Sequence, residues 1–497
     1  ITLNRFFALH VVALPIVLLA LVVLHLLALH EVGSNNPDGV DIKKVKDENG
    51  VPLDGIAFHP YYSVHDLQAL GVFLFIFCAI VFFLPEMGGY FLEYANFEEA
   101  NSLKTPEHIA PVWYFTPFYS VLRAVPDKFW GFVAFAASVA IPFMLPWLDR
   151  SPVNSWRYRG NITKVMLVLF TASFLILGVL GVRAPTPGRT ALAQVCSIIY
   201  FAFFLLMPIW TSLDRTKPVP KRVTMDGGIG FWGSMGGLAL ILALTILPLK
   251  AVGADAAYKC GSIPCDDFKA DPHDKASLQN GARLYMNYCM GCHSLKYARY
   301  NRVAGDLGIP EDLFEANLMF DPNTKIGSLM DNAMDDGNAK VWFGATPPDL
   351  TLVSRARQPE WLYTYLRTFY KDPSRPYGVN NKVFKDVGMP HVLLELQGMQ
   401  ECAMGPVTAG NGGVKRDPLT GQDVLENPCG TFSISEAGEL SPEEFDDAMY
   451  DLVNFMAYMS EPMVADRHRI GTYVLMFIVL FFVLASLLNR EYWKDVH

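Results

Sequence analysis

The sequence predicts a mainly α-helical protein in which a bundle of membrane-spanning helices is joined to one large domain outside the membrane. The chain has 497 residues, 52% of them hydrophobic and 13% aromatic, and the apolar residues are clustered in long uncharged runs. Runs of about twenty apolar residues are typical of helices that cross a bilayer. About seven such spans lie near 8–29, 69–85, 129–148, 163–182, 191–212, 229–250 and 470–488. The stretch 255–465 has ordinary polarity and is long enough for one folded domain.

The distribution of basic residues predicts the side of the membrane on which each part lies. Lys and Arg gather after the third span, after the fifth span and at the C-terminus, as at Arg157, Arg159, Lys217 and Arg490. Such basic segments are cytoplasmic in multi-pass proteins. Counting spans from them places the start of the chain and the domain at 255–465 outside. The net charge of −9 argues against nucleic-acid binding.

The sixth span resembles an internal signal sequence. A basic segment precedes it at 217–222, and small residues follow its apolar core at 252–256. This pattern predicts either cleavage into two mature proteins or a retained anchor. The predicted division is a membrane part at 1–222, a signal or anchor helix with linker at 223–256, the outer domain at 257–465, and a C-terminal anchor at 466–497.

Residues 289–293 read Cys-Met-Gly-Cys-His, which is the attachment signature of c-type haem. The thiols of Cys289 and Cys292 would bond covalently to the porphyrin, and His293 would bind the iron. A zinc knuckle or a redox cysteine pair is the alternative. Zinc requires a second ligand pair at similar spacing, and none is nearby. Haem c is attached on the oxidising side of the membrane, which agrees with the topology.

A sixth iron ligand is expected from the same domain. Met389, in Val-Gly-Met-Pro-His, is the best candidate because Gly and Pro on either side favour an ordered loop close to the iron. A sulfur ligand would raise the reduction potential. His391 is the rival ligand, and an ordinary core methionine is the alternative for Met389.

Two histidines lie on one side of the first span. His10 and His25 are fifteen residues apart, which is roughly 22 Å along a helix and about 60° around it. A histidine inside a membrane helix is costly and therefore suggests a function. This spacing fits axial ligands of two stacked haems, one toward each surface. The alternative is that both hydrogen-bond to neighbouring helices.

The first half of the chain resembles cytochrome b of cytochrome bc1 complexes, from its fourth transmembrane helix onward. The resemblance is carried by residues 3–39, by FHPYYSVHD at 58–66 and by residues 105–128. It implies that His10 binds the low-potential haem b near the outer face and His25 the high-potential haem b near the inner face. It also implies that His30 and Asp66 contact quinone at the inner, reducing site.

The same resemblance implies a quinol-oxidising site near the outer face. Its residues would be Pro111, Val112, Trp113, Tyr114 and Tyr119. Many relatives have Glu where this chain has Val112, which cannot accept a proton, so we expect another proton exit here. The spacing of the two haem-binding histidines is one residue longer than in mitochondrial relatives, and a kink at Pro15 could absorb the difference.

Each haem b requires a second histidine, which in this family comes from the second helix of cytochrome b. His59, His65 and His108 lie in loops or at helix ends and offer no matching pair. We therefore expect a companion polypeptide with the first three helices, or an N-terminal part ahead of Ile1.

Residues 275–497 resemble cytochrome c1, including the segment PPDLTLVSRAR at 347–357 and the C-terminal anchor. The resemblance implies that Arg355 contacts a haem propionate, for which its planar fork is suited. A surface salt bridge is the alternative.

The eight cysteines divide by compartment. Cys78 and Cys196 lie in spans and are expected to be packing residues, whereas four others lie outside, where disulfides form. Three pairings of these four are possible. The simplest is Cys260–Cys265 with Cys402–Cys429.

Together these features predict a redox subunit of a quinol–cytochrome c oxidoreductase in a bacterial inner membrane, with one haem c in the periplasm, two haems b and bound quinone. The expected partners are the N-terminal part of cytochrome b, a Rieske iron–sulfur protein, a soluble or tethered cytochrome c, lipid and a second copy of the complex. Acidic stretches at 306–315, 331–336 and 441–451 could form the docking face for cytochrome c. The alternative is a membrane-tethered c-type electron carrier to a terminal oxidase. A b6f-like enzyme is disfavoured, because its cytochrome f has a different fold.

Overall fold

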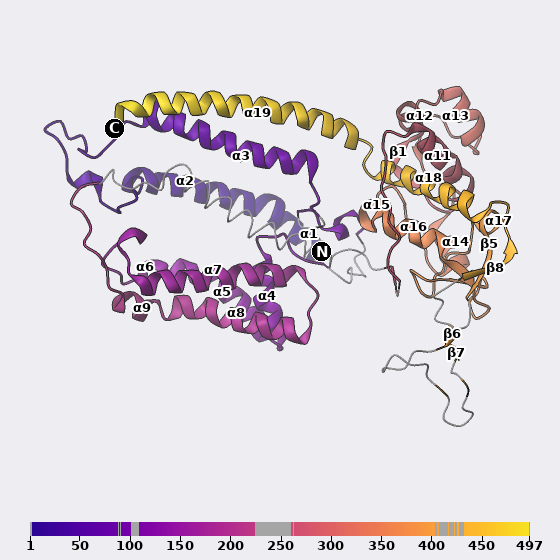
Figure 1. Cartoon of the computed structure of the whole chain (residues 1–497), viewed down its shortest axis with the longest axis horizontal. Coiled ribbons are helices and arrows are strands. Elements are labelled where there is room, and N and C mark those ends of the chain that lie inside the picture. The colour runs from indigo at the N-terminus through magenta and orange to yellow at the C-terminus, as the bar shows by residue number, and fades with distance from the viewer. Residues whose placement is uncertain are drawn as a thin grey trace. The chain divides into compact units, whose positions relative to one another are not determined.

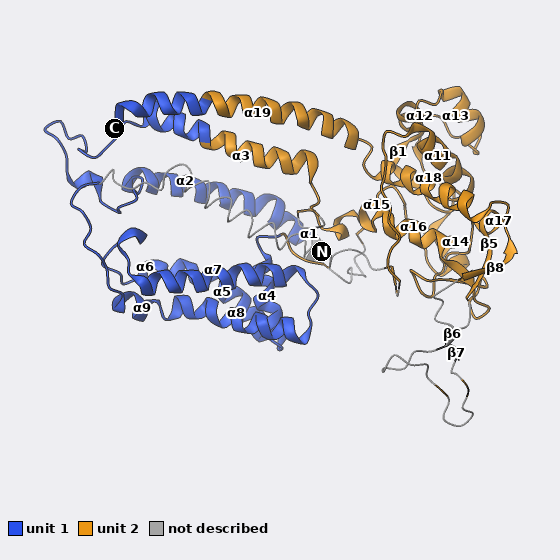
Figure 2. Cartoon of the chain, in the orientation of Figure 1, with its two compact units in different colours: residues 1–68, 113–246, 485–497 blue, residues 69–112, 247–484 orange. Residues whose placement is uncertain are grey.

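The computed structural model describes residues 2–87, 89, 91–100, 109–223, 260–261, 263–402, 405–406, 416, 422, 425–426 and 432–496, and the statements below concern these residues. The predicted span at 229–250 and the small residues at 252–256 lie outside them. The chain divides into two compact units, which are coloured separately in Figure 2. The first comprises residues 1–68, 113–246 and 485–497, and the second residues 69–112 and 247–484.

Within the described residues, six helices are long and apolar enough to cross a membrane. They are Asn4–Val32, Phe58–Phe83, Lys128–Leu148, Asn161–Val182, Pro187–Leu205 and Val464–Val496. They overlap six of the predicted spans, so the mainly α-helical membrane class is confirmed.

The first unit is helical, and prolines at helix starts and side-chain caps set several of its boundaries. Pro117, Pro187 and Pro208 lie in the first turns of α4, α8 and α9, where a missing N–H costs nothing. The elements (Figure 1) are α1 (Thr2–Ala8), η1 (Leu9–Ala13), α2 (Leu14–Val32), η2 (Ile42–Lys44), η3 (Phe58–Tyr62), α4 (Thr116–Ala124), α5 (Lys128–Ala140), η5 (Ile141–Met144), α6 (Leu145–Leu148), η6 (Trp156–Tyr158), α7 (Asn161–Val182), α8 (Pro187–Leu205), α9 (Met207–Leu213) and η7 (Trp493–Val496).

Helices α4, α7 and α8 form the core of the first unit. Phe170 and Phe203 stack with ring centroids 4.5 Å apart, and the Tyr200 hydroxyl donates to the Ser138 carbonyl at 2.8 Å. A Cβ at Gly181 would overlap the Thr116 carbonyl, so glycine is needed where α7 meets α4. Such close packing and internal polar satisfaction hold membrane helices together, because lipid supplies no hydrophobic drive between them.

The second unit contains the outer domain, whose elements are α11 (Lys275–Tyr288), β1 (Leu295–Arg299), α12 (Tyr300–Leu307), α13 (Glu311–Leu318), β2 (Leu329–Met330), α14 (Asp336–Phe343), α15 (Val353–Ala356), α16 (Pro359–Arg367), β3 (Phe369–Lys371), β4 (Val379–Asn381), α17 (Leu394–Gln397), β5 (Gly398–Cys402), β6 (Gly405–Pro406), β7 (Leu425–Glu426), β8 (Phe432–Ala437) and α18 (Pro442–Ser460). The described strands form antiparallel pairs: β1 with β2, β3 with β4, β5 with β8, and β6 with β7.

Helices α11 and α18 form the centre of the outer domain. A Cβ at Gly281 would overlap the Asp451 carbonyl, so glycine allows the two helices to cross closely. Tyr285, Leu452 and Phe455 are fully buried there. Burial of each such side chain contributes about 1.5–3 kcal/mol, and the motif at 289–293 follows directly from this rigid helix.

Two long helices, α3 (Ser63–Phe83) and α19 (Val464–Tyr492), have residues in both units. In the second unit, Gly471 lies against Phe82, and the Phe82 carbonyl accepts a hydrogen bond from Arg467. In the first, the Asn489 amide donates to the Gln68 side chain at 2.7 Å. The C-terminal anchor is therefore paired with the second described span.

Candidate functional site

The Cys-x-x-Cys-His motif forms a tight turn at the end of α11. The helix begins at an Asp274 cap and ends at Cys289, and the amides of Cys292 and His293 both donate to the Cys289 carbonyl, at 3.0 and 2.9 Å. Both thiols of the motif are free. Burial raises the pKa of Cys289 to about 12 and also raises the pKa of Cys292, so both thiols are protonated at neutral pH.

The imidazole of His293 is oriented by a residue far away in the sequence. Its Nδ1 lies 2.8 Å from the Pro348 carbonyl, so Nδ1 carries the proton and Nε2 keeps its lone pair. Burial lowers the pKa of His293 and favours this neutral ring, although Pro348 and Asp349 act in the opposite direction. Two free thiols and a fixed, neutral imidazole in one turn are the donor set that a covalent haem requires.

Met389 and His391, the two candidates for the sixth ligand, lie in one segment beyond β4. Met389 packs against the cluster of Phe369, Val379 and Val387, and the Tyr365 hydroxyl donates to its sulfur at 3.3 Å. His391 is buried and stacks on Phe369, with ring centroids 5.0 Å apart.

The buried His391 ring has poor polar surroundings. Among the described residues neither of its nitrogens makes a well-formed hydrogen bond, although Gly398 and Gln397 are near. Burial lowers the pKa of His391 to about 4, so the ring is neutral. Met389 and His391 therefore both stay chemically competent as ligands.

Arg355 is engaged by a loop that follows α3. Its Nε lies 2.5 Å from a Glu86 carboxylate oxygen, and its guanidinium carbon lies 4.1 Å from the centroid of the Phe97 ring. In the same loop the Tyr94 hydroxyl accepts from Gln358 at 2.7 Å. This contact corresponds to the salt-bridge alternative. An arginine side chain has five N–H donors, so the contact with Glu86 leaves donors for a haem propionate. The propionate role stays a prediction.

The first of the two histidines predicted to bind haem b lies in a π turn, and the second lies in the α-helix that follows. His10 lies in η1 (Leu9–Ala13), where the Leu14 amide bonds to the Leu9 carbonyl, and His25 lies in α2; both side chains are exposed. A π turn accommodates one extra residue in a helix. This turn ends two residues before Pro15.

The residues predicted for quinone lie at helix ends and in an exposed loop. His30 is in the last turn of α2 and Asp66 in the first turn of α3, and both are exposed. Trp113 and Tyr114 are also exposed, with ring centroids 5.5 Å apart. Pro111 and Val112 precede them, and 45% of the Val112 surface is exposed.

Arg123, which sequence analysis did not single out, contacts Tyr119 on the same helix, α4. Its guanidinium lies 4.7 Å from the centroid of the Tyr119 ring. It also donates to the carbonyls of Leu180, Gly181 and Arg183 at the end of α7, at 2.5, 3.2 and 3.0 Å. The Arg123 guanidinium thus has four partners, and no local sequence pattern predicts them.

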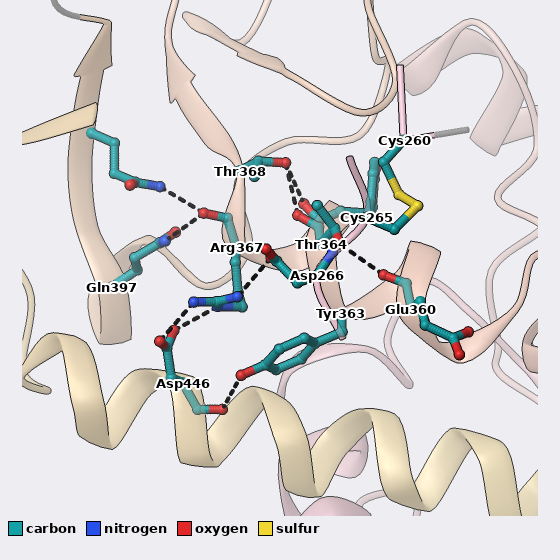
Figure 3. Close-up of polar contacts among 12 residues, drawn as sticks. Cys260, Cys265, Asp266, Glu360, Tyr363, Thr364, Arg367, Thr368, Gln397 and Asp446 are labelled. Atoms are coloured by element: carbon teal, nitrogen blue, oxygen red, sulfur yellow. Dashed lines mark hydrogen bonds and ion pairs between the residues drawn. A yellow bond between two sulfur atoms is a disulfide. The ribbon is translucent and has the colours of Figure 1, made fainter. Parts of the chain in front are cut away.

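Arg367, at the end of α16, is a second residue that sequence analysis missed. Figure 3 shows its fork bonded to both oxygens of Asp446, at 2.6 Å each, and to Asp266 at 2.7 Å. The Cys260–Cys265 disulfide, one of the predicted pairs, directly precedes Asp266. Cys402 is also disulfide-bonded, but its predicted partner Cys429 lies outside the described residues.

Replacing Arg367 with lysine should destabilise the outer domain by about 1–3 kcal/mol, because an ammonium cannot make the same paired contacts. Because Arg367 is partly exposed, the loss of stability should not exceed this range. The expected observation is a lower urea midpoint for the change in the haem c absorption spectrum of the intact complex. Lys371→Arg, at the exposed pair with Glu401, is the control and should leave the midpoint unchanged. An unaltered midpoint in Arg367→Lys would contradict the role.

Three family models match parts of this chain. Residues 1–117 match the family model "Cytochrome b(N-terminal)/b6/petB", residues 99–201 match "Cytochrome b(C-terminal)/b6/petD", and residues 267–403 and 436–496 match "Cytochrome C1 family". Cytochrome c1 of Allochromatium vinosum is 48% identical over 260 residues, which are 52% of this chain and 98% of that protein. The chain belongs to the cytochrome c1 family.

The part ahead of the cytochrome c1 region is similar to a portion of cytochrome b. Cytochrome b of Allochromatium vinosum is 55% identical over 231 residues, which are 45% of this chain and 56% of that protein, so the chain spans about half of that relative. "Cytochrome b/c1" of Bradyrhizobium diazoefficiens is 29% identical over all of this chain and 73% of its own length. The chain is therefore a bc1-type subunit, and its families imply haem b and covalent haem c and typically bind quinone.

Proposed function

We propose that this chain serves electron transfer from quinol to cytochrome c in a bc1-type complex, with quinone reduction through two haems b. The observation that carries the proposal is the turn at 289–293, where free thiols accompany an imidazole fixed by Pro348 at 2.8 Å. One-electron transfer is the chemistry that haems supply when bound. The chain contributes their ligands, their spacing and the access of protons.

The proposed ligands are the residues that the motif and the family resemblance indicate. Cys289 and Cys292 would hold haem c covalently, and His293 and Met389 would bind its iron. His10, within the π turn, and His25, in α2, would each provide one ligand to a haem b. The facing histidines come from the N-terminal part of cytochrome b, supplied by a companion polypeptide or by residues ahead of this chain. Arg355 adds a charge for a haem propionate.

Proton-coupled quinone chemistry is proposed at two places. His30 and Asp66 offer titratable groups for quinone reduction at the inner face. The proposed quinol-oxidising site at the outer face is lined by Pro111, Val112, Trp113, Tyr114 and Tyr119. Tyr119 is positioned by Arg123, and Val112 leaves proton exit to another acid or to water.

Replacing Val112 with glutamate should leave quinol oxidation within about threefold of the parent rate, because proton exit does not depend on this position. Its side chain is 45% exposed, so a carboxylate there incurs little burial cost. Steady-state reduction of cytochrome c by the purified complex measures the effect, with Val112→Gln as an uncharged control of similar size. A strong loss confined to the glutamate variant would contradict the proposed exit.

The proposed setting is a bacterial inner membrane with the haem c domain in the periplasm and the basic loops in the cytoplasm. The proposed domains are 1–222, 223–256, 257–465 and 466–497. The proposed partners are the Rieske iron–sulfur protein, the N-terminal part of cytochrome b, lipid, a second copy of the complex and cytochrome c. The acidic stretches 306–315, 331–336 and 441–451 would face cytochrome c, where opposite charge speeds encounter.

A reduced-minus-oxidised spectrum of the purified complex, together with subunit masses, tests the function. A c band with two b components in one assembly is expected. A c band without any b component would overturn the proposal in favour of a tethered electron carrier. The masses also decide whether the chain remains whole or is cleaved between its two halves.

A further inference from the structure

Tyr365 places its hydroxyl against the sulfur of Met389. The oxygen-to-sulfur distance is 3.3 Å, within the range of a hydrogen bond to sulfur. The tyrosine lies on α16, and the methionine lies twenty-four residues further along the chain. A buried tyrosine hydroxyl normally finds a partner, and here that partner is the thioether.

The ring of Tyr365 is held from several sides. It stacks on Trp361, with centroids 4.9 Å apart and planes 9° apart, and meets Phe369 edge to face at 5.2 Å. The Asn381 amide donates to the Tyr365 carbonyl at 2.8 Å. At the end of the same helix, Arg367 is tied to α18 through Asp446. These contacts fix the position of the ring and therefore of its hydroxyl.

We propose that Tyr365 is a positioning residue that sets the haem c reduction potential through its hydrogen bond to Met389. The inference rests on the proposed function, in which Met389 is the sixth iron ligand. A thioether sulfur is a weak acceptor that can be shared between a hydroxyl proton and a metal. The hydroxyl withdraws electron density from sulfur, which weakens sulfur donation most for ferric iron. The ferrous state is favoured as a result, and the reduction potential rises.

The test compares two tyrosines of one helix in the intact complex. Tyr365→Phe keeps the ring and removes the donor, so the haem c midpoint potential should shift downward while the sulfur-to-iron charge-transfer band persists. Tyr363→Phe is the control, because the Tyr363 hydroxyl donates to the Asp446 carbonyl, at 3.4 Å, and not to Met389. Its potential should match the parent value. Equal potentials in the two variants would overturn the inference.

Two further arms separate this inference from the proposed function. In Met389→Leu, an unchanged potential and charge-transfer band would refute Met389 as the ligand, and with it the basis of the inference. A changed potential there, with no effect of Tyr365→Phe, refutes the inference alone. Should Tyr365→Phe fail to fold, a monofluorinated tyrosine at 365 retains the shape and is a stronger donor. It should shift the potential upward, and no shift would overturn the inference.

Discussion

Replacing Met389 with leucine should lower the haem c reduction potential by roughly 0.2 V, because leucine cannot bind iron. Axial ligands set haem potentials over a range of about 0.8 V, and a methionine ligand lies toward its upper end. A tenfold change in a one-electron equilibrium is about 59 mV. The variant would thus be roughly a thousandfold poorer as an electron acceptor, and turnover should fall steeply. Redox titration of the haem c band measures the shift.

The change in packing should be small in this variant, so the effect on the potential comes mainly from the lost iron ligand. Leucine and methionine are close in volume, and such exchanges usually cost less than about 1.5 kcal/mol. The control is His391→Leu, which removes the rival ligand from its stack on Phe369. If His391 were the ligand instead, the potential would change in His391→Leu and stay unaltered in Met389→Leu.

The covalent haem motif could be predicted from the sequence because its chemistry is local. Cys289, Cys292 and His293 are contiguous, and the helix before them is capped by neighbouring residues. The partner that orients His293 could not be predicted, because Pro348 is fifty-five residues away and reaches it only through tertiary folding. The hydrogen bond from Tyr365 to Met389 could not be predicted for the same reason.

The membrane spans could be predicted from composition, but the helix irregularity between the two haem b histidines could not. Pro15 was expected to absorb the extra residue by a kink, whereas the structure has a π turn over Leu9–Ala13. Proline lacks an N–H and clashes with the carbonyl four residues earlier, which is that of Val11. The hydrogen bonds ahead of it are therefore easily rearranged, and a π turn inserts the residue without breaking the helix.

The contacts of the loop after α3 were also beyond sequence analysis. Glu86 and Glu99 look like solvated charges, yet they pair with Arg355 and Lys296, residues that lie about two hundred or more positions further along. The hydrogen bond between Lys296 and Glu99 also raises the pKa of the Lys296 ammonium group. The signs of the charges alone cannot predict which residues pair. Residues so far apart in the sequence meet only when the whole segment between them has folded.

Replacing His25 with leucine should remove one of the two b-type components from the spectrum of the complex and leave haem c intact. Haem b is held without covalent bonds, so an iron that loses an axial imidazole binds weakly or changes spin state. The ratio of haem b to haem c should fall from about two to about one. Quinone reduction should then be lost, because one step of the chain across the membrane is missing.

His10→Leu should remove the other b component, so the two variants together assign each haem to a depth in the bilayer. Leucine suits an apolar helix in lipid, and the helix around both positions exposes apolar side chains throughout, so the span itself should insert normally. His468→Leu is the matched control: that ring stacks on Phe83 at 5.4 Å in α19 and has no proposed iron. If both b components persisted in His10→Leu and in His25→Leu, these imidazoles would serve helix packing only. The proposed electron route across the membrane would then have no haem ligands in this chain.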